Sequence, residues 1–213
     1  SRERVGMEMT KILTGENVHS IIDQMLSLGV LDRVFENMHV ELPPELSTEY
    51  LVNLALLFRN SELSGEELAS KMRDLLVLSK NDLLEISMMH ECRYLSLDLT
   101  IESARRFHAA VSDRRKRMIM SYLEKNGIET EKFEKLFRSI NPGDLILKPI
   151  VDGERLANVT GLIPGPRLGR LKGWLHRRQI EEASRTEEDV LQFLSDIDWE
   201  SSDYREWGSL SWP

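Results

Sequence analysis

The chain has 213 residues, of which 41% are hydrophobic and 30% are charged. This length and apolar content allow one or two domains, each with a buried core. The longest apolar run, near residues 50–58, is far shorter than the roughly 20 residues that span a bilayer, so we expect no membrane segment. The single cysteine, Cys92, excludes an internal disulfide and is typical of a reducing compartment.

The formal charge of −8 is unevenly distributed along the chain. Residues 1–104 hold 9 Lys and Arg against 18 Asp and Glu, residues 105–180 hold 17 against 8, and residues 181–213 hold 2 against 10. The middle segment is therefore basic and the outer segments are acidic. We expect a phosphate-binding surface in the middle segment. The alternative is that the three segments neutralise one another.

Apolar residues recur with helical spacing along the chain, and no run alternates in the manner of a strand. The first two apolar stripes, over 5–13 and 18–26, are followed by glycines that end helices well, Gly15 and Gly29. A third helix is predicted over 46–58, after a pair of prolines. These patterns predict an all-α fold.

Capping residues mark the helices that follow. Two capping boxes, which begin at Ser64 and Ser79, predict helices that extend to residues 76 and 89. Further helices are predicted over 100–111, 114–123, 130–137, 167–182 and 186–194. Residues 145–151 follow an Asn-Pro-Gly break and are predicted to be an extended linker.

No constellation of residues predicts an active site. Asp196 and Asp198 form a D-x-D pair, but they lie in an acidic stretch without a glycine-rich loop, so we interpret them as a solvated acidic face. The chain has five histidines without metal-ligand spacing, namely His19, His39, His90, His108 and His176. Cys92 is interpreted as structural. The sequence thus predicts no catalytic residue, no metal site and no cofactor in this chain.

A glycine-rich turn precedes the helix predicted over 167–182. Such a turn leaves backbone N–H groups and the positive end of the helix dipole free to hold a phosphate. We predict that this segment binds RNA phosphates through Gly165, Arg167, Gly169, Arg170, Lys172, Arg177 and Arg178. The alternative is a turn whose glycines only allow close helix packing.

A second basic cluster lies earlier in the chain. We predict that it follows an RNA backbone by charge rather than by base sequence, through Arg105, Arg106, Arg114, Arg115, Lys116 and Arg117. The prediction requires two successive helices to present these side chains outward together. The alternative is a solvated basic face without a ligand.

Residues 1–15 resemble the S-x-E-R-[IV]-x-x-E-x-x-K-I-L-x-G signature, called motif E, of class II tRNA nucleotidyltransferases, the CCA-adding enzymes. The matching positions are Ser1, Glu3, Arg4, Val5, Glu8, Lys11, Ile12, Leu13 and Gly15. Near the other end, residues 161–169 resemble the G-x-x-P-G-P-x-[IVL]-G motif of the same family's tail. The two motifs thus bracket almost the whole chain.

The resemblance implies a helical neck over 1–29, a helical body over 30–144 and a smaller helical tail over 145–213. It also implies that catalysis, with Mg²⁺, belongs to a head absent from this chain and supplied in cis or in trans. The expected partners are that head and the acceptor and TΨC arms of tRNA. The expected location is the cytoplasm, and also mitochondria in a eukaryote.

Within motif E, the resemblance implies that Ser1, Glu3, Arg4, Glu8 and Lys11 hold the neck against the head. A purely local role in helix stability through pairs three or four residues apart is the alternative. Residues 199–213, with three tryptophans among acidic side chains, depart from the family pattern, and we expect them to pack.

Two other functions remain open at this stage. One is the same portion of a bacterial poly(A) polymerase, which shares the architecture. The other is a helical protein-interaction adaptor. The addition of CC, of A or of all of CCA is not distinguished by these residues.

Overall fold

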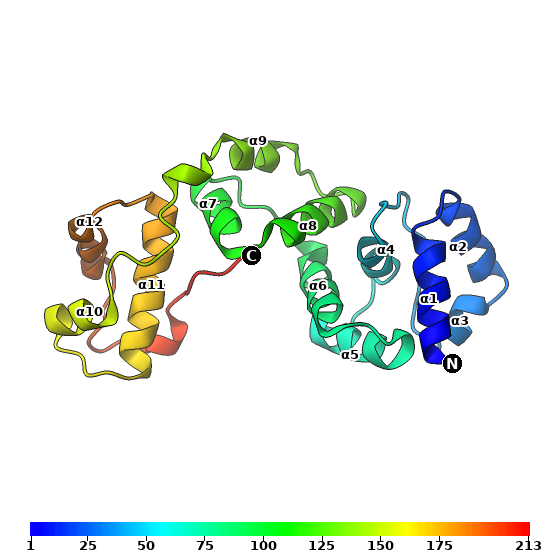
Figure 1. Cartoon of the computed structure of the whole chain (residues 1–213), viewed down its shortest axis with the longest axis horizontal. Coiled ribbons are helices and arrows are strands. Elements are labelled where there is room, and N and C mark those ends of the chain that lie inside the picture. Colours follow the sequence, from blue (N-terminus) through cyan, green and yellow to red (C-terminus); the bar gives the residue numbers. More distant parts are fainter. The chain divides into compact units, whose positions relative to one another are not determined.

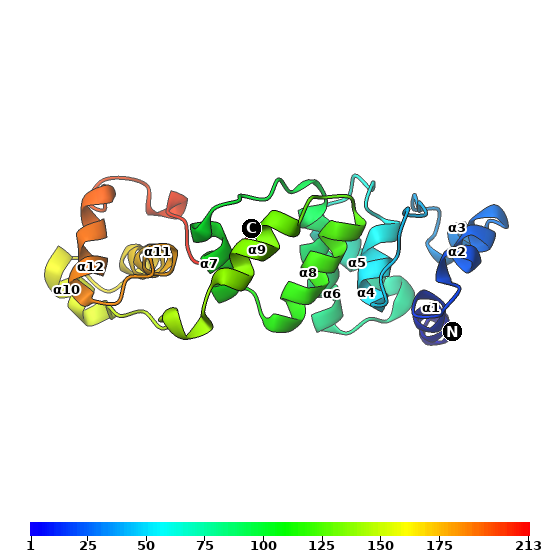
Figure 2. The same cartoon turned by 90° about the horizontal axis from the view of Figure 1, so that it is seen from above.

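The computed structural model describes residues 1–213 apart from the side chain of Asp144. Every regular element in this described part is helical, with twelve α-helices and four short 3-10 helices, which confirms the all-α prediction. Within the same part, no helix has the length and apolar character needed to cross a membrane. Contacts divide the chain into a first unit, residues 1–96 and 113–130, and a second unit, residues 97–112 and 131–213 (Figure 1, Figure 2).

The first unit contains seven α-helices and a 3-10 turn among its described residues. They are α1 (Arg2–Leu13), α2 (Val18–Ser27), α3 (Val30–Val34), α4 (Tyr50–Leu57), α5 (Gly65–Leu76), α6 (Lys80–Glu91), η1 (Cys92–Tyr94) and α8 (Asp113–Lys125). The predicted capping box at Ser64 is complete, whereas at Ser79 the cap has only the half made by the serine hydroxyl. Ser64 caps α5 reciprocally with Glu67, and the Ser79 hydroxyl accepts the backbone N–H of Asp82.

The second unit contains the remaining elements. They are α7 (Ile101–Ala110), α9 (Glu131–Ser139), η2 (Pro142–Asp144), α10 (Gly153–Thr160), α11 (Pro166–Glu182), α12 (Glu187–Gln192), η3 (Phe193–Asp196) and η4 (Tyr204–Glu206). The chain therefore leaves the first unit at residue 97, returns for α8 and leaves again at residue 131. The neck, body and tail boundaries at residues 29 and 144 form a different, family-based division and stay predictions.

Helix α4 is the centre of the first unit. Its residues from Leu51 to Leu57 are all buried, as expected of a helix that is apolar on every side. It packs against α1, α6 and α8. At its end, Phe58 meets Phe35 edge to face, with ring centroids 5.0 Å apart.

Asn53 is a fully buried polar residue of α4. Its Oδ1 accepts the backbone N–H of Ser47 at 2.6 Å, and its Nδ2 donates to the carbonyl oxygens of Leu13 and Ser47, each at 2.7 Å. One amide thus joins the end of α1 to the loop before α4. A buried side chain with its polar atoms satisfied in this way specifies one arrangement of neighbouring segments.

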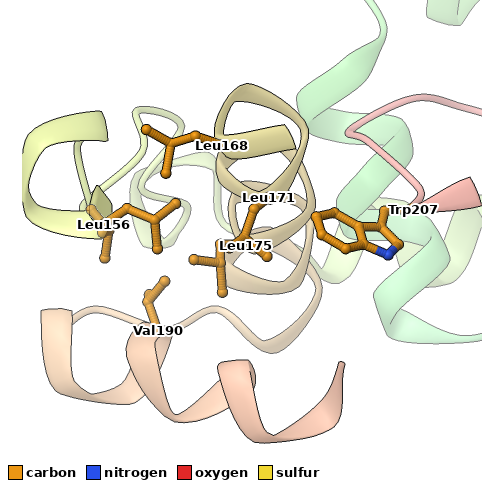
Figure 3. Packing of buried hydrophobic residues seen from close by; sticks show 7 residues of the cluster. Leu156, Leu168, Leu171, Leu175, Val190 and Trp207 are labelled. Carbon is orange, nitrogen blue, oxygen red and sulfur yellow. The ribbon is translucent and has the colours of Figure 1, made fainter. Parts of the chain in front are cut away.

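The α11 core organises the tail part of the second unit. Leu168, Leu171 and Leu175 project from α11 and are buried with Leu156 of α10, Val190 of α12 and Trp207 (Figure 3). The predicted linker also docks here, because Gln179 is buried and its side-chain amide pairs with the backbone of residues 146, 148 and 150. Residues 145–151 contain no helix, as predicted.

The tryptophans of the C-terminal segment are packed, as the sequence analysis expected. Trp207 and Trp212 are each 5% exposed. Trp207 belongs to the α11 core, whereas the Trp212 ring lies 4.5 Å from that of Phe107 in a cluster with Phe133. Aromatic burial therefore fixes the segment at two places in the second unit.

We predict that Asn53→Ala lowers the free energy of unfolding by about 2–3 kcal/mol, because the buried backbone groups of Leu13 and Ser47 lose their partner. Asn81→Ala, at an exposed site of α6, is the control and should change it by less than about 0.5 kcal/mol. Urea denaturation of both variants measures the difference. Equal stabilities would contradict the role assigned to Asn53.

The burial of His90 should make the stability of the fold depend on pH. It is buried in α6, its Nε2 lies 2.8 Å from the Leu63 carbonyl oxygen, and burial lowers its pKa below the ordinary value of 6.5. The folded state thus favours neutral imidazole. The contribution of His90 to the free energy of unfolding is therefore complete above the pKa of the unfolded state and is lost as pH falls below that value. Denaturant titrations between pH 7.5 and about 5 measure this loss. The free energy of unfolding should fall less steeply with pH for His90→Gln than for the exposed-site control His39→Gln.

Candidate RNA interface

Helix α1 turns the polar motif-E-like residues toward solvent. Its buried positions are Gly6, Met9 and Leu13, and a Cβ at Gly6 would lie 2.3 Å from the Leu76 carbonyl oxygen of α5. Glycine at this position therefore permits a close α1–α5 contact. All five motif positions assigned a structural role, Ser1, Glu3, Arg4, Glu8 and Lys11, are exposed.

One local ion pair of the predicted kind is present on α1. Lys11 Nζ lies 3.1 Å from Glu8 Oε1, and both side chains are more than half exposed. Such an exposed pair contributes about 0.2–0.5 kcal/mol to a helix. This small contribution supports the local alternative only weakly, and the role of the exposed motif face toward a head stays a prediction.

Two hollows lie beside the exposed side of α1. The larger, of about 510 Å³, is lined by apolar residues that include Leu28, by Arg2 and Arg33, and by Glu36, whose carboxylate lies 3.7 Å from the Arg2 guanidinium. The smaller, of about 310 Å³, is lined by Arg4 among others, and Val5 and Val34 border both hollows. The surface beside α1 thus combines arginine side chains with apolar residues. Arg2 and Arg33 are not among the site residues predicted from the sequence, because they meet only where the turn at Gly29 brings α3 back to α1.

The Arg114–Arg117 run is distributed around α8 by the helical rotation of about 100° per residue. Arg115 Nε pairs at 3.1 Å with the buried carboxylate of Glu85, and the buried Lys116 Nζ lies 2.9 Å from Asp113. Arg114, 56% exposed, makes only a 3.5 Å pair with Asp82, and the exposed Arg117 donates to a backbone carbonyl of its own helix. Two of the four cations therefore face solvent.

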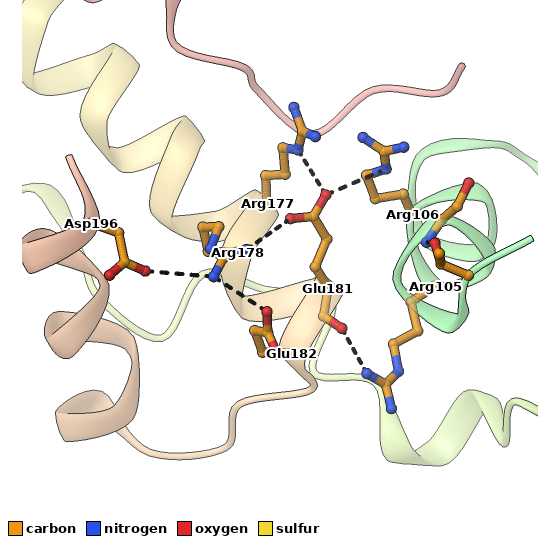
Figure 4. Close-up of polar contacts among 9 residues, drawn as sticks. Arg105, Arg106, Arg177, Arg178, Glu181, Glu182 and Asp196 are labelled. Carbon is orange, nitrogen blue, oxygen red and sulfur yellow. Dashed lines mark hydrogen bonds and ion pairs between the residues drawn. The ribbon is translucent and has the colours of Figure 1, made fainter. Parts of the chain in front are cut away.

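The other predicted arginines lie in the second unit, where Glu181 gathers four of them (Figure 4). Its Oε1 is 2.8 Å from Arg177 Nε and 3.4 Å from Arg106 Nε, and its Oε2 is 3.7 Å from Arg178. Arg105 donates to the Glu181 backbone carbonyl at 2.6 Å. The Glu181 side chain is 8% exposed, so the pairs lie largely outside bulk solvent. Two clusters that were predicted separately thus meet around one carboxylate.

Arg178 has two further acidic neighbours. Its guanidinium lies 3.3 Å from Glu182 and 3.5 Å from Asp196, and it stacks over the Phe193 ring at 5.0 Å. Asp198 accepts hydrogen bonds from the backbone N–H and hydroxyl of Ser201. The D-x-D pair therefore stabilises local structure. Among residues 1–143 and 145–213, no group of three or more His, Cys, Asp or Glu is placed to hold a metal ion.

At the start of α11, Pro166 occupies the first helical position, as expected for a residue without an N–H. Gly165 has extended backbone and a Cβ at Gly169 would meet nothing within 4 Å, so neither glycine is required by close packing. Gly161 is different, because it ends α10 with a φ of 73°. Lys172 is half-buried and has no ion pair among the described residues.

Residues 1–42, which contain α1 to α3, match a family model described as "Probable RNA and SrmB- binding site of polymerase A". No curated protein and no solved structure matches the chain. The match supports an RNA-binding region of the poly(A) and CCA polymerase kind in this segment, and it includes every motif-E-like position. The segment holds 4 Lys and Arg against 7 Asp and Glu, so charge alone does not mark it.

Arg167 should behave as a structural residue. It donates to three backbone carbonyl oxygens, those of Trp199, Glu200 and Ser202, at 2.7 to 3.0 Å. Arg167→Ala should therefore lower the free energy of unfolding by about 2 kcal/mol, whereas Lys172→Ala should change it by less than about 0.5 kcal/mol. Thermal and urea denaturation provide the comparison, and equal effects would show that the three hydrogen bonds contribute little.

Proposed function

We propose that residues 1–213 are the RNA-binding portion of a CCA-adding tRNA nucleotidyltransferase. The parent reaction adds cytidine and adenosine to tRNA 3′ ends from CTP and ATP. Mg²⁺ and the catalytic residues belong to a head domain outside residues 1–213, in cis or in trans. The chain described here binds the acceptor and TΨC arms and holds the tRNA at a fixed distance from that head.

The observation that carries the proposal is the exposure of the polar motif-E-like residues on α1, within the segment that matches the polymerase A family model. The second, tail-like motif extends the resemblance to the other unit. Arg114 and Arg117 add exposed cations within the first unit. Phosphate contacts of this kind position a nucleic acid without selecting its sequence, which suits an enzyme that accepts every tRNA.

The second candidate is the corresponding portion of a poly(A) polymerase. The matched description names polymerase A, which favours this candidate. The acidic residues 181–213 favour the tRNA enzyme, since we expect a basic C-terminus in a bacterial poly(A) polymerase. The two candidates differ in ligand, because one requires a folded tRNA and the other a flexible 3′ end.

Binding of the purified chain to three RNAs tests both candidates. The RNAs are tRNA without its CCA end, a duplex of equal length and a single-stranded oligo(A), each titrated across salt. Preference for folded tRNA, with affinity that falls as salt rises, supports the tRNA enzyme. Preference for oligo(A) supports the polymerase, and no binding to any RNA at low salt overturns both and leaves a helical interaction protein.

Charge reversal on α8 tests the surface directly. Arg114→Glu with Arg117→Glu should weaken tRNA binding by about tenfold or more and make the salt dependence shallower, because two phosphate contacts are lost. Lys71→Glu with Arg73→Glu makes the same charge change at exposed positions of α5 and is the matched control. Equal losses for the two double variants would mean that only net charge matters and that α8 is not part of the interface.

A further inference from the structure

The C-terminal segment, residues 198–213, lies against α11 and is called the strap below. Its one regular element is η4, and among the described residues its backbone-to-backbone hydrogen bonds are local. Examples are Ser202 N–H to Asp198 O and Trp207 N–H to Tyr204 O. The strap can therefore leave α11 without breaking the hydrogen-bond ladder of any other helix.

Arginine side chains of α11 make the polar contacts with the strap. Arg167 donates to the three strap carbonyl oxygens described above, and its guanidinium also lies 5.5 Å from the ring centroids of Tyr204 and Trp207. Arg170 donates to the backbone carbonyl of Arg205 at 3.3 Å. The guanidinium of one α11 residue is thus enclosed by strap backbone and aromatic rings together.

Arg177 lies under the far part of the strap. A Cβ at Gly208 would meet Arg177 Nη1, so the strap backbone passes directly over this guanidinium. Arg167, Arg170 and Arg177 are three and seven residues apart, which places them along one face of α11. The strap therefore covers a row of three arginines.

The chemistry of these contacts resembles that of phosphate binding. The acceptors that meet Arg167 and Arg170 are oxygens, but they are neutral carbonyl oxygens. Ionised oxygens form shorter and stronger hydrogen bonds with guanidinium groups than neutral ones do. The strap also carries four acidic residues against one basic residue, so it repels a polyanion while it stays in place.

We propose that the strap is an intramolecular cover on a polyanion-binding row formed by Arg167, Arg170 and Arg177, and that RNA engages this row when the strap is displaced. The inference rests on the proposed RNA-binding function and adds its regulation. Strap carbonyl oxygens occupy the positions that phosphate oxygens take in the open form. Trp207 and Trp212 hold the closed form, and the second of these anchors lies outside the α11 core.

A reversible covalent lock tests the proposal without unfolding the chain. A Cβ at Gly173 would lie 3.7 Å from the Cβ of Ser209, within the about 3.5–4.5 Å that a disulfide requires. Gly173→Cys with Ser209→Cys should therefore form a disulfide under oxidising conditions. The native Cys92 is buried and should not interfere. Failure of the disulfide to form would overturn the placement of the strap on α11.

The oxidised double variant should bind tRNA without its CCA end about tenfold more weakly than the same protein after reduction, with a shallower salt dependence. Ser209→Cys alone should bind equally in both redox states. Equal binding by the locked and reduced double variant overturns the cover while leaving the proposed function intact. Absence of RNA binding by the reduced protein at low salt overturns both.

Release of the outer anchor provides the converse measurement. Trp212→Ala should raise RNA affinity several-fold, and this gain should be lost when Arg170→Gln is added to the same chain. Hydrogen exchange of α11 checks that the second unit stays folded. A gain that persists with Arg170→Gln would show that the arginine row is not the uncovered site.

Discussion

The buried carboxylate of Glu181 is the interaction on which the second unit depends. Arg106 reaches it from α7, whereas Arg177 and Arg178 reach it from α11, and Arg105 binds the carbonyl of the same residue. A buried carboxylate is costly unless it is paired, and guanidinium groups this close to each other repel unless an anion lies between them. The arginines therefore offset the cost of burying the carboxylate, and the carboxylate offsets the repulsion among the guanidinium groups. This mutual compensation joins residues more than 70 positions apart in the sequence.

The same constraint separates cations that hold the fold from cations that can bind a ligand. Arg115 pairs with the buried Glu85, and Lys116 is itself buried, so neither can approach a phosphate without loss of an internal contact. Arg114 and Arg117 occupy the outer face of the same helix. In the first unit, fewer cations can therefore bind a ligand than the basic run on α8 suggests. Displacing an ion pair exchanges one attraction for another, so an unpaired exposed cation contributes more to RNA affinity.

Local features of the fold could be predicted from the sequence. The helix caps at Ser64 and Ser79, the uniformly apolar α4 and the helix-free linker over 145–151 each follow from residues within a few positions of one another. The outward and inward sides of α8 also follow from helical rotation, although a count of basic residues does not show them. The local pattern therefore predicted most of the helices, although not α3 or α10, and it did not predict their partners.

The partners of the arginines could not be predicted, because they come from distant segments. The pairing of Arg105 with Glu181 and of Arg167 with residues 199–202 depends on tertiary packing. The partners of Gln179 could not be predicted either, since nothing near it in the sequence indicates that its side-chain amide hydrogen-bonds to the linker backbone. For the candidate site, motif E and the family match locate α1 to α3, and only the fold adds Arg2 and Arg33.

Carbonyl oxygens and carboxylates satisfy a guanidinium in different ways. Glu181 supplies both hydrogen-bond acceptors and a negative charge, so the arginines around it are neutralised. The strap carbonyls at Arg167 and Arg170 supply acceptors without charge. Arg167 has the strap carboxylates of Asp198 and Asp203 as charged neighbours, and Arg170 keeps a buried Nε without a hydrogen-bond partner among the described residues. A polyanion that replaces the carbonyls gains a Coulombic attraction that the neutral strap backbone does not provide. In a chain of net charge −8, a strap that covers these arginines confines RNA binding through them to the open form.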